Sequence, residues 1–263
     1  MFTKYLMFQS APLPTIVHSR PAYHATDTTG FDLILPCCNP SHGWMETLVK
    51  HYKEVTAELY PVRIQLILVN DGSVKNFEQV HIEWLRKAIP GIIIVSYTEN
   101  RGKGYAIREG VKHARSRYQI YTDLDFPFGT AVIREVYDHL LAGKDIVAAE
   151  RGTGYLNVLP RKRKIITRLS RAANKYLLQL KVNDAQAGLK GFNNRGKAIL
   201  LSTRVDGFLY DSEFIHRAGK QKALSIVPVP VHCREGIAFS SFRFKLLWKE
   251  LNNYLRIIGK SQG

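Results

Sequence analysis

Cysteine is scarce in this sequence, and the few cysteines are not spaced for a structural role. The 263 residues include three, of which Cys37 and Cys38 are adjacent and Cys233 is distant. This arrangement matches neither a disulfide framework nor the paired spacing of a zinc site. The sequence therefore indicates a protein of a reducing compartment.

Long apolar runs are also missing. Nowhere do about 18 consecutive apolar residues occur, the length that a membrane-spanning helix requires. The first residues, MFTKYLMFQSAPLP, contain one lysine and a broken apolar run. We therefore expect neither a signal peptide nor a membrane anchor at this end, and no helix that crosses a bilayer.

Acidic residues are few relative to basic ones. The 22 Asp and Glu stand against 38 Lys and Arg, which gives a formal net charge of +16. Such an excess predicts an anionic partner: nucleic acid, an acidic membrane surface or a phosphate-bearing substrate. No helix-turn-helix, zinc or RNA-binding signature accompanies the charge, so a nucleic-acid-binding module is the poorest of these hypotheses.

What the chain does contain is an alternation of apolar runs and helical patterns from residue 31 onward. Runs rich in Ile, Leu and Val occupy 31–36, 63–73, 91–100, 118–125 and 145–152. This rhythm predicts an α/β protein with a Rossmann-like, mostly parallel sheet flanked by helices. In such sheets ligands bind beyond the carboxyl ends of the strands, where this chain places small, polar or acidic residues.

Two of these strand ends support a binding and a purely structural interpretation. In VNDGS, Asp71 can accept hydrogen bonds from a base or ribose and Gly72 can admit a ligand to the backbone. An ordinary turn with a helix-capping Asp explains this motif equally simply and is favoured when it stands alone. The glycines around Lys103 in NRGKGYAIREG fit a phosphate-binding helix start or a tight turn, with nothing to separate the two.

A third strand end, YTDLDFPFG, carries two acids. Asp123 and Asp125 are two residues apart, so in an extended segment both carboxylates face one side. Two close carboxylates repel each other unless a cation lies beside them, and Mg²⁺ or Mn²⁺ bridging a diphosphate suits this arrangement. The alternative is one helix cap and one solvated acid, but the position after a fourth strand favours the metal site.

Two basic amphipathic helices are predicted in the second half. In 161–180 an apolar stripe from Ile165 to Leu180 opposes Arg161, Lys164, Arg168, Arg171 and Lys175. In the C-terminal segment a stripe from Phe244 to Ile258, with Trp248, is flanked by five basic residues. Packing on the sheet and binding to a membrane interface explain this composition about equally well.

The motifs taken together resemble a known family. LILPCCNP, LILVNDGS, ENRGKGYAIREG, YTDLDFP, DAQAGLKGF and FLYDSEFIHRAGKQKALSIVPVPV occur in this order. The set is similar to the inverting family 2 glycosyltransferases of GT-A fold, in particular to the polyprenyl-phosphate branch that includes dolichyl-phosphate mannose synthases. The resemblance covers roughly 31–235, which leaves 1–30 as an N-terminal extension and 236–263 as a C-terminal interfacial helix.

The resemblance implies roles for individual residues. It implies a nucleotide-sugar pocket formed by Pro36, Asn39, Asp71, Gly72, Lys103 and Asp123. Asp184 and Gln186 match the segment that faces the donor sugar and acceptor phosphate, and Arg151 matches an arginine expected to meet anionic groups. Asp211 and Glu213 match the acidic pair in the last helical segment before the VPVPV strand, and the resemblance implies that these five residues are catalytic. The metal, Mg²⁺ or Mn²⁺, falls to Asp125 with Asp123. Some relatives carry a glutamine where this chain has Pro127, so a metal ligand is either missing here or supplied by His232 or water.

The resulting hypothesis is a metal-dependent transfer of a sugar from a UDP- or GDP-linked donor to polyprenyl phosphate. It places the protein on the cytoplasmic face of the cell membrane, as a peripheral protein without nucleic-acid partners. The expected contacts to the anionic membrane and the acceptor phosphate are Arg161, Arg163, Lys164, Arg168 and Trp248. Two alternatives stay open: a hydroxyl acceptor, with Asp184, Asp211 or Glu213 as base, and a pseudoenzyme weakened by Pro127.

Overall fold

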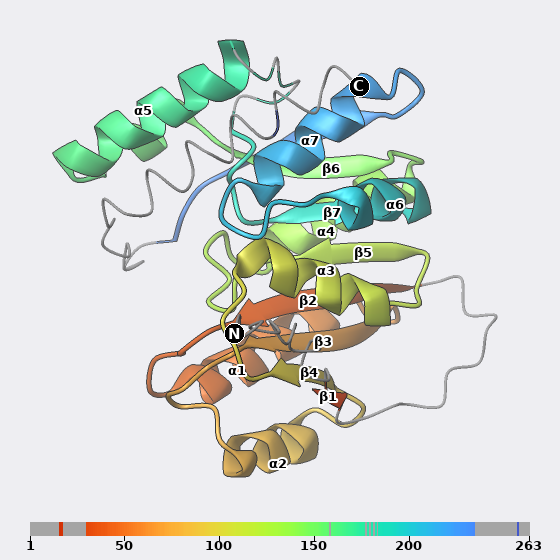
Figure 1. Ribbon diagram of the computed structural model, residues 1–263. Helices are drawn as coiled ribbons and strands as arrows, with labels where there is room; N and C mark the ends of the chain where they lie inside the picture. The colour runs from red at the N-terminus through yellow and green to blue at the C-terminus, as the bar shows by residue number, and fades with distance from the viewer. Residues whose placement is uncertain are drawn as a thin grey trace, which may run out of the picture.

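The computed structural model describes residues 16–17, 30–157, 159–176, 178, 180, 182, 184–234 and 257. These residues form one sheet with helices on both faces (Figure 1). The strands are β1 Ile16–Val17, β2 Gly30–Cys37, β3 Arg63–Asp71, β4 Ile93–Tyr97, β5 Tyr118–Tyr121, β6 Ile146–Arg151, β7 Lys190–Phe192 and β8 Ile226–Val231. The α-helices are α1 Trp44–Glu58, α2 Gln79–Ala88, α3 Lys103–His113, α4 Ala131–Leu141, α5 Arg161–Tyr176, α6 Asn194–Ser202 and α7 Tyr210–Lys220.

The sheet is mostly parallel, as the sequence predicts. Within the described residues its order is β1-β4-β3-β2-β5-β7-β6-β8. β2 pairs in parallel with β3 and β5, β3 with β4, and β6 with β8, whereas β1 and β7 run antiparallel to their neighbours. The strand order reverses at β2, so the carboxyl ends of β2, β3 and β5 face a common crevice.

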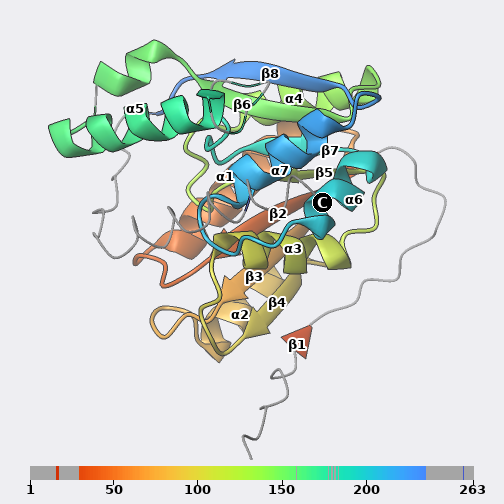
Figure 2. The same cartoon turned by 45° about the horizontal axis from the view of Figure 1, so that its top comes forward.

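The central parallel strands consist mainly of apolar residues, so helices can cover them on both faces of the sheet. In β3, every residue of RIQLILVND except Arg63 is buried. One hydrophobic cluster packs α1, α2 and α4 against one face of the sheet. A second cluster packs α3, α6 and α7 against the other face, a division that Figure 2 shows from a second direction.

Helix α5 stands apart from these two layers. It projects beside the sheet in Figures 1 and 2, preceded by a short 3₁₀ helix at Thr153–Asn157. Its sequence predicts an amphipathic helix over 161–180, and the helix is found but ends at Tyr176. None of the described α5 side chains belongs to either hydrophobic cluster of the sheet.

The sequence-based fold assignment is confirmed, with omissions. The five expected strands and the helices around 45–60, 80–88 and 103–113 are present. The sequence argument did not identify α4, β7 or α6. β7 is three residues long and its LKGF sequence lacks the length of a strand signal. The predicted C-terminal helix, with Trp248, and most of 1–30 lie outside the described residues.

No helix in the described part of the chain is long and apolar enough to span a membrane.

One buried carboxylate joins β6, α6 and β8. Asp145, which precedes β6, accepts hydrogen bonds from Asn193 Nδ2 at 2.9 Å, Arg195 at 3.0 Å and the Ser225 amide at 2.9 Å. Burial alone would raise the pKa of Asp145, but the hydrogen bonds from Ser225 and Asn193 hold it below its usual value. The ionised carboxylate therefore stabilises this part of the sheet.

Asp145→Asn is expected to lower the free energy of unfolding by about 1–3 kcal/mol at neutral pH, because the charged acceptor is lost. A depressed pKa stabilises the fold above the unfolded value of about 3.9 and stops doing so as pH falls through the folded value. The difference between wild type and variant should thus shrink below about pH 4. Urea denaturation at several pH values measures it; Asp138→Asn, an exposed acid paired with Arg134, is the control.

Candidate functional site

The turns after β2, β3 and β4 are tied together by short polar contacts. The Asn39 amide donates to Ser73 Oγ at 2.8 Å, and Asn39 Oδ1 accepts from the amides of Val74 at 2.8 Å and Lys75 at 3.1 Å. Asn39 has a φ of 45°, a left-handed conformation that asparagine tolerates well. Asn39, at the end of β2, therefore holds the turn that follows β3, beside the half-buried Pro36.

Asp71 and Gly72 make close contacts with the segment before α3. The buried Asp71 carboxylate accepts hydrogen bonds from the amides of Arg101 at 2.7 Å and Gly102 at 3.0 Å. A Cβ on Gly72, whose φ is 59°, would lie 2.3 Å from the Asn100 nitrogen. The close backbone neighbour of Gly72 is thus the chain itself rather than a ligand, and contact of Asp71 with a nucleotide base stays a prediction.

The two glycines around Lys103 are required by packing. A Cβ on Gly102 would lie 2.5 Å from the Asp206 carbonyl oxygen, and one on Gly104 would lie 2.5 Å from the Val205 carbonyl oxygen. The Gly104 amide already donates to that Asp206 oxygen at 2.8 Å. Close contact between the start of α3 and the segment before α7 therefore explains the two glycines of the motif.

Lys103 forms an ion pair with Asp123 at the centre of the crevice. Burial alone would lower the pKa of Lys103, but Asp123 and Asp211 raise it above its usual value. Gly188 lies directly against the pair, since a Cβ there would be 2.3 Å from Asp123 Oδ2 and 3.1 Å from Lys103 Nζ. These charges favour the protonated form of Lys103, and its contact with a donor diphosphate stays a prediction.

Asp125 differs from the other acids because no side chain of the described residues pairs with its carboxylate. It is exposed, and partial desolvation, followed by the charge of Asp123, raises its pKa. A carboxylate in this state gains from a nearby cation. Mg²⁺ is commonly held by one or two carboxylates and substrate phosphates, so Asp123 and Asp125 fit a metal that the donor diphosphate completes.

His232 does not complete a protein-only metal site here. It is exposed just after β8. Among the residues the structure covers, no three His, Cys, Asp or Glu side chains are placed to hold one ion. Asp123, Asp125 and His232 thus do not converge as a three-ligand set.

Asp184 is clamped by two arginines. Arg151 donates to its carboxylate at 2.6 and 2.9 Å, and Arg171 of α5 donates at 2.9 Å. Burial would raise the pKa of Asp184, but Arg151 and then Arg171 hold it below its usual value. The sequence argument placed Arg151 and Asp184 in the site, and the structure joins them. From the sequence, Arg171 was expected on the basic face of the helix, opposite the apolar stripe; in the structure it points inward to Asp184.

Asp211 belongs to a second buried network. Lys190 Nζ lies 2.8 Å from Asp211 Oδ1, and the Tyr121 hydroxyl donates to the same oxygen. Lys190 is fully buried and also donates to the Ala187 carbonyl oxygen at 2.6 Å. Sequence reasoning missed Lys190, although a lysine among the apolar residues of LKGF was an available signal.

Glu213 has a structural environment. Its buried carboxylate accepts from the amides of Arg204 at 2.8 Å and Val205 at 2.7 Å, and Arg217 Nε lies 2.8 Å from its other oxygen. These bonds hold the segment that packs on Gly102 and Gly104. Glu213 is close in sequence to Asp211 but belongs to a different set of contacts. Through the segment that it holds, Glu213 supports the start of α3.

Helix α5 presents apolar side chains to solvent and polar ones to the site. Ile165, Leu169 and Tyr176 are 58%, 65% and 72% exposed. On the inner side, Ser170 donates to Gln186 Oε1 at 2.8 Å, next to the Arg171 contact with Asp184. The predicted basic residues of this helix surround the apolar strip: Arg161 and Arg168 are exposed, Arg163 and Lys164 half-buried.

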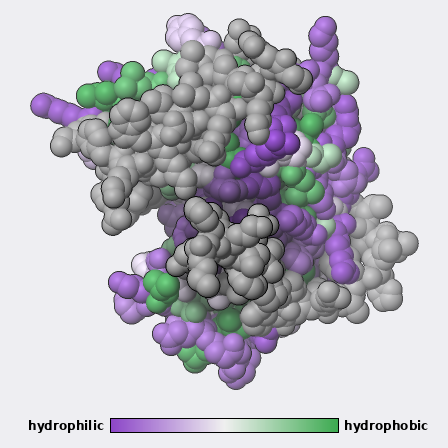
Figure 3. Space-filling view, viewed as in Figure 1, coloured by the Kyte–Doolittle hydropathy of each residue, from purple (hydrophilic) through white to green (hydrophobic). Residues whose placement is uncertain are grey.

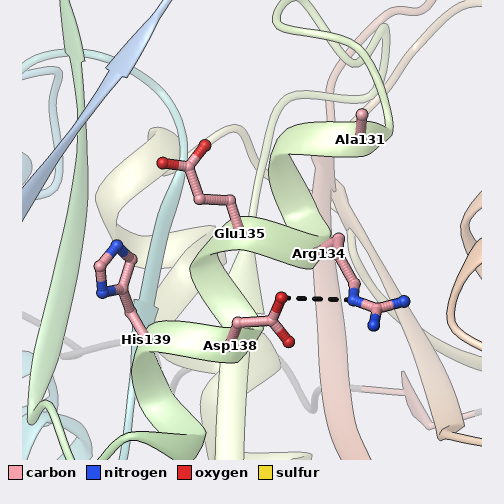
Figure 4. A pocket seen from close by; sticks show the side chains of 5 residues that line it. All are labelled: Ala131, Arg134, Glu135, Asp138 and His139. Atoms are coloured by element: carbon pink, nitrogen blue, oxygen red, sulfur yellow. Dashed lines mark hydrogen bonds and ion pairs between the residues drawn. The ribbon is translucent and has the colours of Figure 1, made fainter.

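Figure 3 shows a recess near the middle of the face seen in Figure 1, with hydrophilic residues on its visible walls. A separate hollow lies on α4, lined by Ala131, Arg134, Glu135, Asp138 and His139 (Figure 4). There Arg134 Nε and Asp138 Oδ2 form an ion pair of 3.3 Å. All five residues come from one helix, so this hollow lacks the convergence of several strand ends.

Comparison with known proteins agrees with this geometry. Residues 32–196 match the family described as Glycosyl transferase family 2. The chain is 31% identical over 121 residues to the bactoprenol glucosyl transferase of Shigella phage SfV, covering 45% of this chain and 38% of that protein. It is 33% identical over 72 residues to dolichyl-phosphate beta-glucosyltransferase of Saccharomyces cerevisiae, covering 26% and 22%. The first alignment thus spans less than two-fifths of that relative's length.

Solved structures share the fold. Glucosyl-3-phosphoglycerate synthase from Mycobacterium tuberculosis, in complex with phosphoglyceric acid, has a TM-score of 0.65 at 17% identity, over 92% of this chain and 86% of that chain. The complex of that enzyme with Mn²⁺, UDP-glucose and phosphoglyceric acid has a TM-score of 0.62 at 15% identity, with the same coverage. At these identities the likeness establishes the GT-A fold alone.

Because the family match covers well over half of the chain, this protein belongs to glycosyl transferase family 2. The resemblance inferred from the ordered motifs is therefore confirmed, as is the assignment to the glycosyltransferase class of enzymes. The roles of individual site residues stay predictions, which the geometry above makes specific.

Gly188→Ala is expected to displace the Lys103–Asp123 pair without unfolding the protein, because the clash falls on the ends of two side chains. We expect UDP or GDP to bind about tenfold more weakly, which corresponds to about 1.4 kcal/mol. Calorimetry measures the affinity and thermal denaturation the fold. Gly154→Ala, where a Cβ meets nothing within 4 Å, is the control; an equal loss in both variants would contradict this role for the pair.

Proposed function

We propose that this protein transfers a sugar, with inversion, from a UDP- or GDP-linked donor to the phosphate of a polyprenyl phosphate. The observation that carries the proposal is the state of its buried carboxylates. Asp184 is held by two arginines, Asp211 by Lys190 and Tyr121, and Glu213 by two amides and Arg217. Each is engaged by donors that stabilise its charged form.

This state favours an acceptor that is already an anion. A sugar hydroxyl needs a general base within hydrogen-bonding reach, and a carboxylate clamped by arginines is a poor proton acceptor. A phosphate monoester has a second pKa of about 6 and is largely a dianion near neutral pH. Its oxygen can attack the anomeric carbon directly, so the buried acids serve to position cations rather than to remove a proton.

The site's cations fit such a displacement. We expect Lys103, which pairs with Asp123, to meet the leaving diphosphate, and the mostly buried Arg151 to meet the acceptor phosphate. Fixed charges of this kind stabilise a transition state because they need no reorganisation during the reaction. A divalent metal held by Asp123 and Asp125 would add positive charge to the diphosphate.

The surface of α5 supports a lipid acceptor. Three exposed large apolar side chains surrounded by basic residues suit an interface with anionic lipids. The names of the two relatives, a bactoprenol and a dolichyl-phosphate glucosyltransferase, point to the same acceptor class. We therefore propose a peripheral position on the cytoplasmic membrane face, with α5 lying in the interface.

The direct test incubates the purified protein with radiolabelled UDP- and GDP-sugars, polyprenyl phosphate and Mn²⁺. Labelled polyprenyl phosphate is the expected product, and a parallel reaction with polyprenol, which lacks the phosphate, should stay unlabelled. Failure to label the lipid phosphate with all common donors would contradict the lipid acceptor. Labelling of a soluble glycan instead would favour the hydroxyl-acceptor alternative.

The pH dependence should follow the acceptor. We expect kcat/KM to rise as the acceptor loses its second proton at about pH 6 and then to level off. Asp184, whose pKa is held below its usual value, should add no further rise above that point. Asp184→Asn should lower kcat by tenfold or more, roughly 1.4 kcal/mol, and retain the shape of the profile. A variant that loses the rise would identify Asp184 as the base.

The α5 surface is tested with vesicles. Ile165→Ser with Leu169→Ser should weaken binding to anionic vesicles by on the order of tenfold, because each side chain loses its burial in the interface. Leu141→Ser on α4 is the matched control, since Leu141 is 55% exposed. Cosedimentation measures the affinity. Equal binding of the double variant and the control would remove the support that α5 lends to a membrane site.

A further inference from the structure

The loop that carries Asp125 has an unusual backbone. Phe126 has a φ of 46°, although it is neither glycine nor asparagine, and its side chain is fully buried. A bulky residue in the left-handed region is a conformational outlier, and it persists only where the surroundings fix it. The direction of the Asp125 side chain depends on this turn, because the two residues are adjacent.

Two groups from distant parts of the chain hold the turn. The Phe126 ring packs on the His51 ring of α1, with 5.1 Å between ring centroids. Arg234, which follows β8, contacts the loop on both sides of Phe126. Its amide donates to the Pro127 carbonyl oxygen at 2.9 Å, and its guanidinium donates to the Asp125 carbonyl oxygen.

The two groups are also joined to each other. Arg234 NH1 lies 3.2 Å from His51 Nε2, and His51 Nδ1 lies 2.9 Å from a Glu54 oxygen. Arg234, His51 and the backbone of Asp125–Pro127 thus form a closed set of contacts behind the turn. Among the described residues no side chain binds the Asp125 carboxylate itself, so this set determines its direction through the backbone.

We propose that Arg234, supported by His51, is a positioning residue that directs the Asp125 carboxylate toward the metal and diphosphate of the donor. This inference rests on the metal dependence proposed above. Pro127 offers no side-chain ligand to a metal. Support of the backbone by Arg234 explains how the Asp125 carboxylate of this loop is nevertheless oriented toward a cation. Arg234 acts through the main-chain carbonyl oxygens of Asp125 and Pro127, so this role requires no contact between its guanidinium and the donor.

The experiment compares UDP binding (or GDP, if the wild type prefers it) with Mn²⁺ and with EDTA by calorimetry. Mn²⁺ should strengthen binding in the wild type. In Arg234→Ala this strengthening should fall by about tenfold, as expected when a group that orients a metal ligand is removed. Binding in EDTA should stay at the wild-type value, and thermal denaturation monitors the fold.

Two further variants and a control sharpen the result. Arg234→Lys keeps one donor for the carbonyl oxygens and should recover part of the Mn²⁺ effect. His51→Phe keeps a ring against Phe126 but removes the nitrogen near Arg234, so it should show a smaller loss. Arg134→Ala, an exposed arginine of α4 paired with Asp138, should behave as the wild type.

Other outcomes overturn the proposal. If Arg234→Ala weakens binding equally in Mn²⁺ and EDTA, Arg234 contacts the nucleotide or supports the whole fold. If it changes neither, the turn holds Asp125 without it. A wild type whose nucleotide binding ignores Mn²⁺ refutes the proposed metal dependence and this inference together, whereas a normal wild type with an unaffected variant refutes the inference alone.

Discussion

A carboxylate that is partly or wholly removed from water needs a cation or several hydrogen-bond donors beside it, and much of this structure satisfies that need. Asp123 has Lys103, Asp211 has Lys190, and Asp184 has two arginines. Each partner comes from a different element, so the pairs join α3, β7, β6 and α5 at the carboxyl edge of the sheet. The same ion pairs thus determine both the distribution of charge at this edge and the contacts between these elements.

Asp125 differs from these acids because no side chain of the described residues pairs with its carboxylate. Burial and the charge of the nearby Asp123 raise the pKa of this carboxylate. The same region contains the cations of Lys103 and Arg151, which pair with Asp123 and Asp184. This combination of paired acids and one carboxylate without a described partner is the basis of the proposed transfer between phosphate-bearing molecules.

The fold was readable from the sequence because it depends on local patterns. Runs such as LILVND predict buried parallel strands, and the ordered motifs indicate the family. The short strand β7 and helices α4 and α6 were not predicted, because their sequence signals are brief or ambiguous. Asp71, Asp123, Asp125, Arg151 and Asp184 were likewise placed at strand ends or matched motifs before their contacts were known.

The sequence by itself determined the alternation of strands and helices, the edge at which the acids gather and the excess of positive charge. Tertiary structure alone decided which partner each acid has. It turned Arg171 inward to Asp184, buried Lys190 against Asp211, and filled the space beside Gly72 and Gly104 with the chain's own backbone. The reason is physical: periodicity is a property of neighbours in sequence, whereas ion pairs and close backbone contacts join residues that only folding brings together.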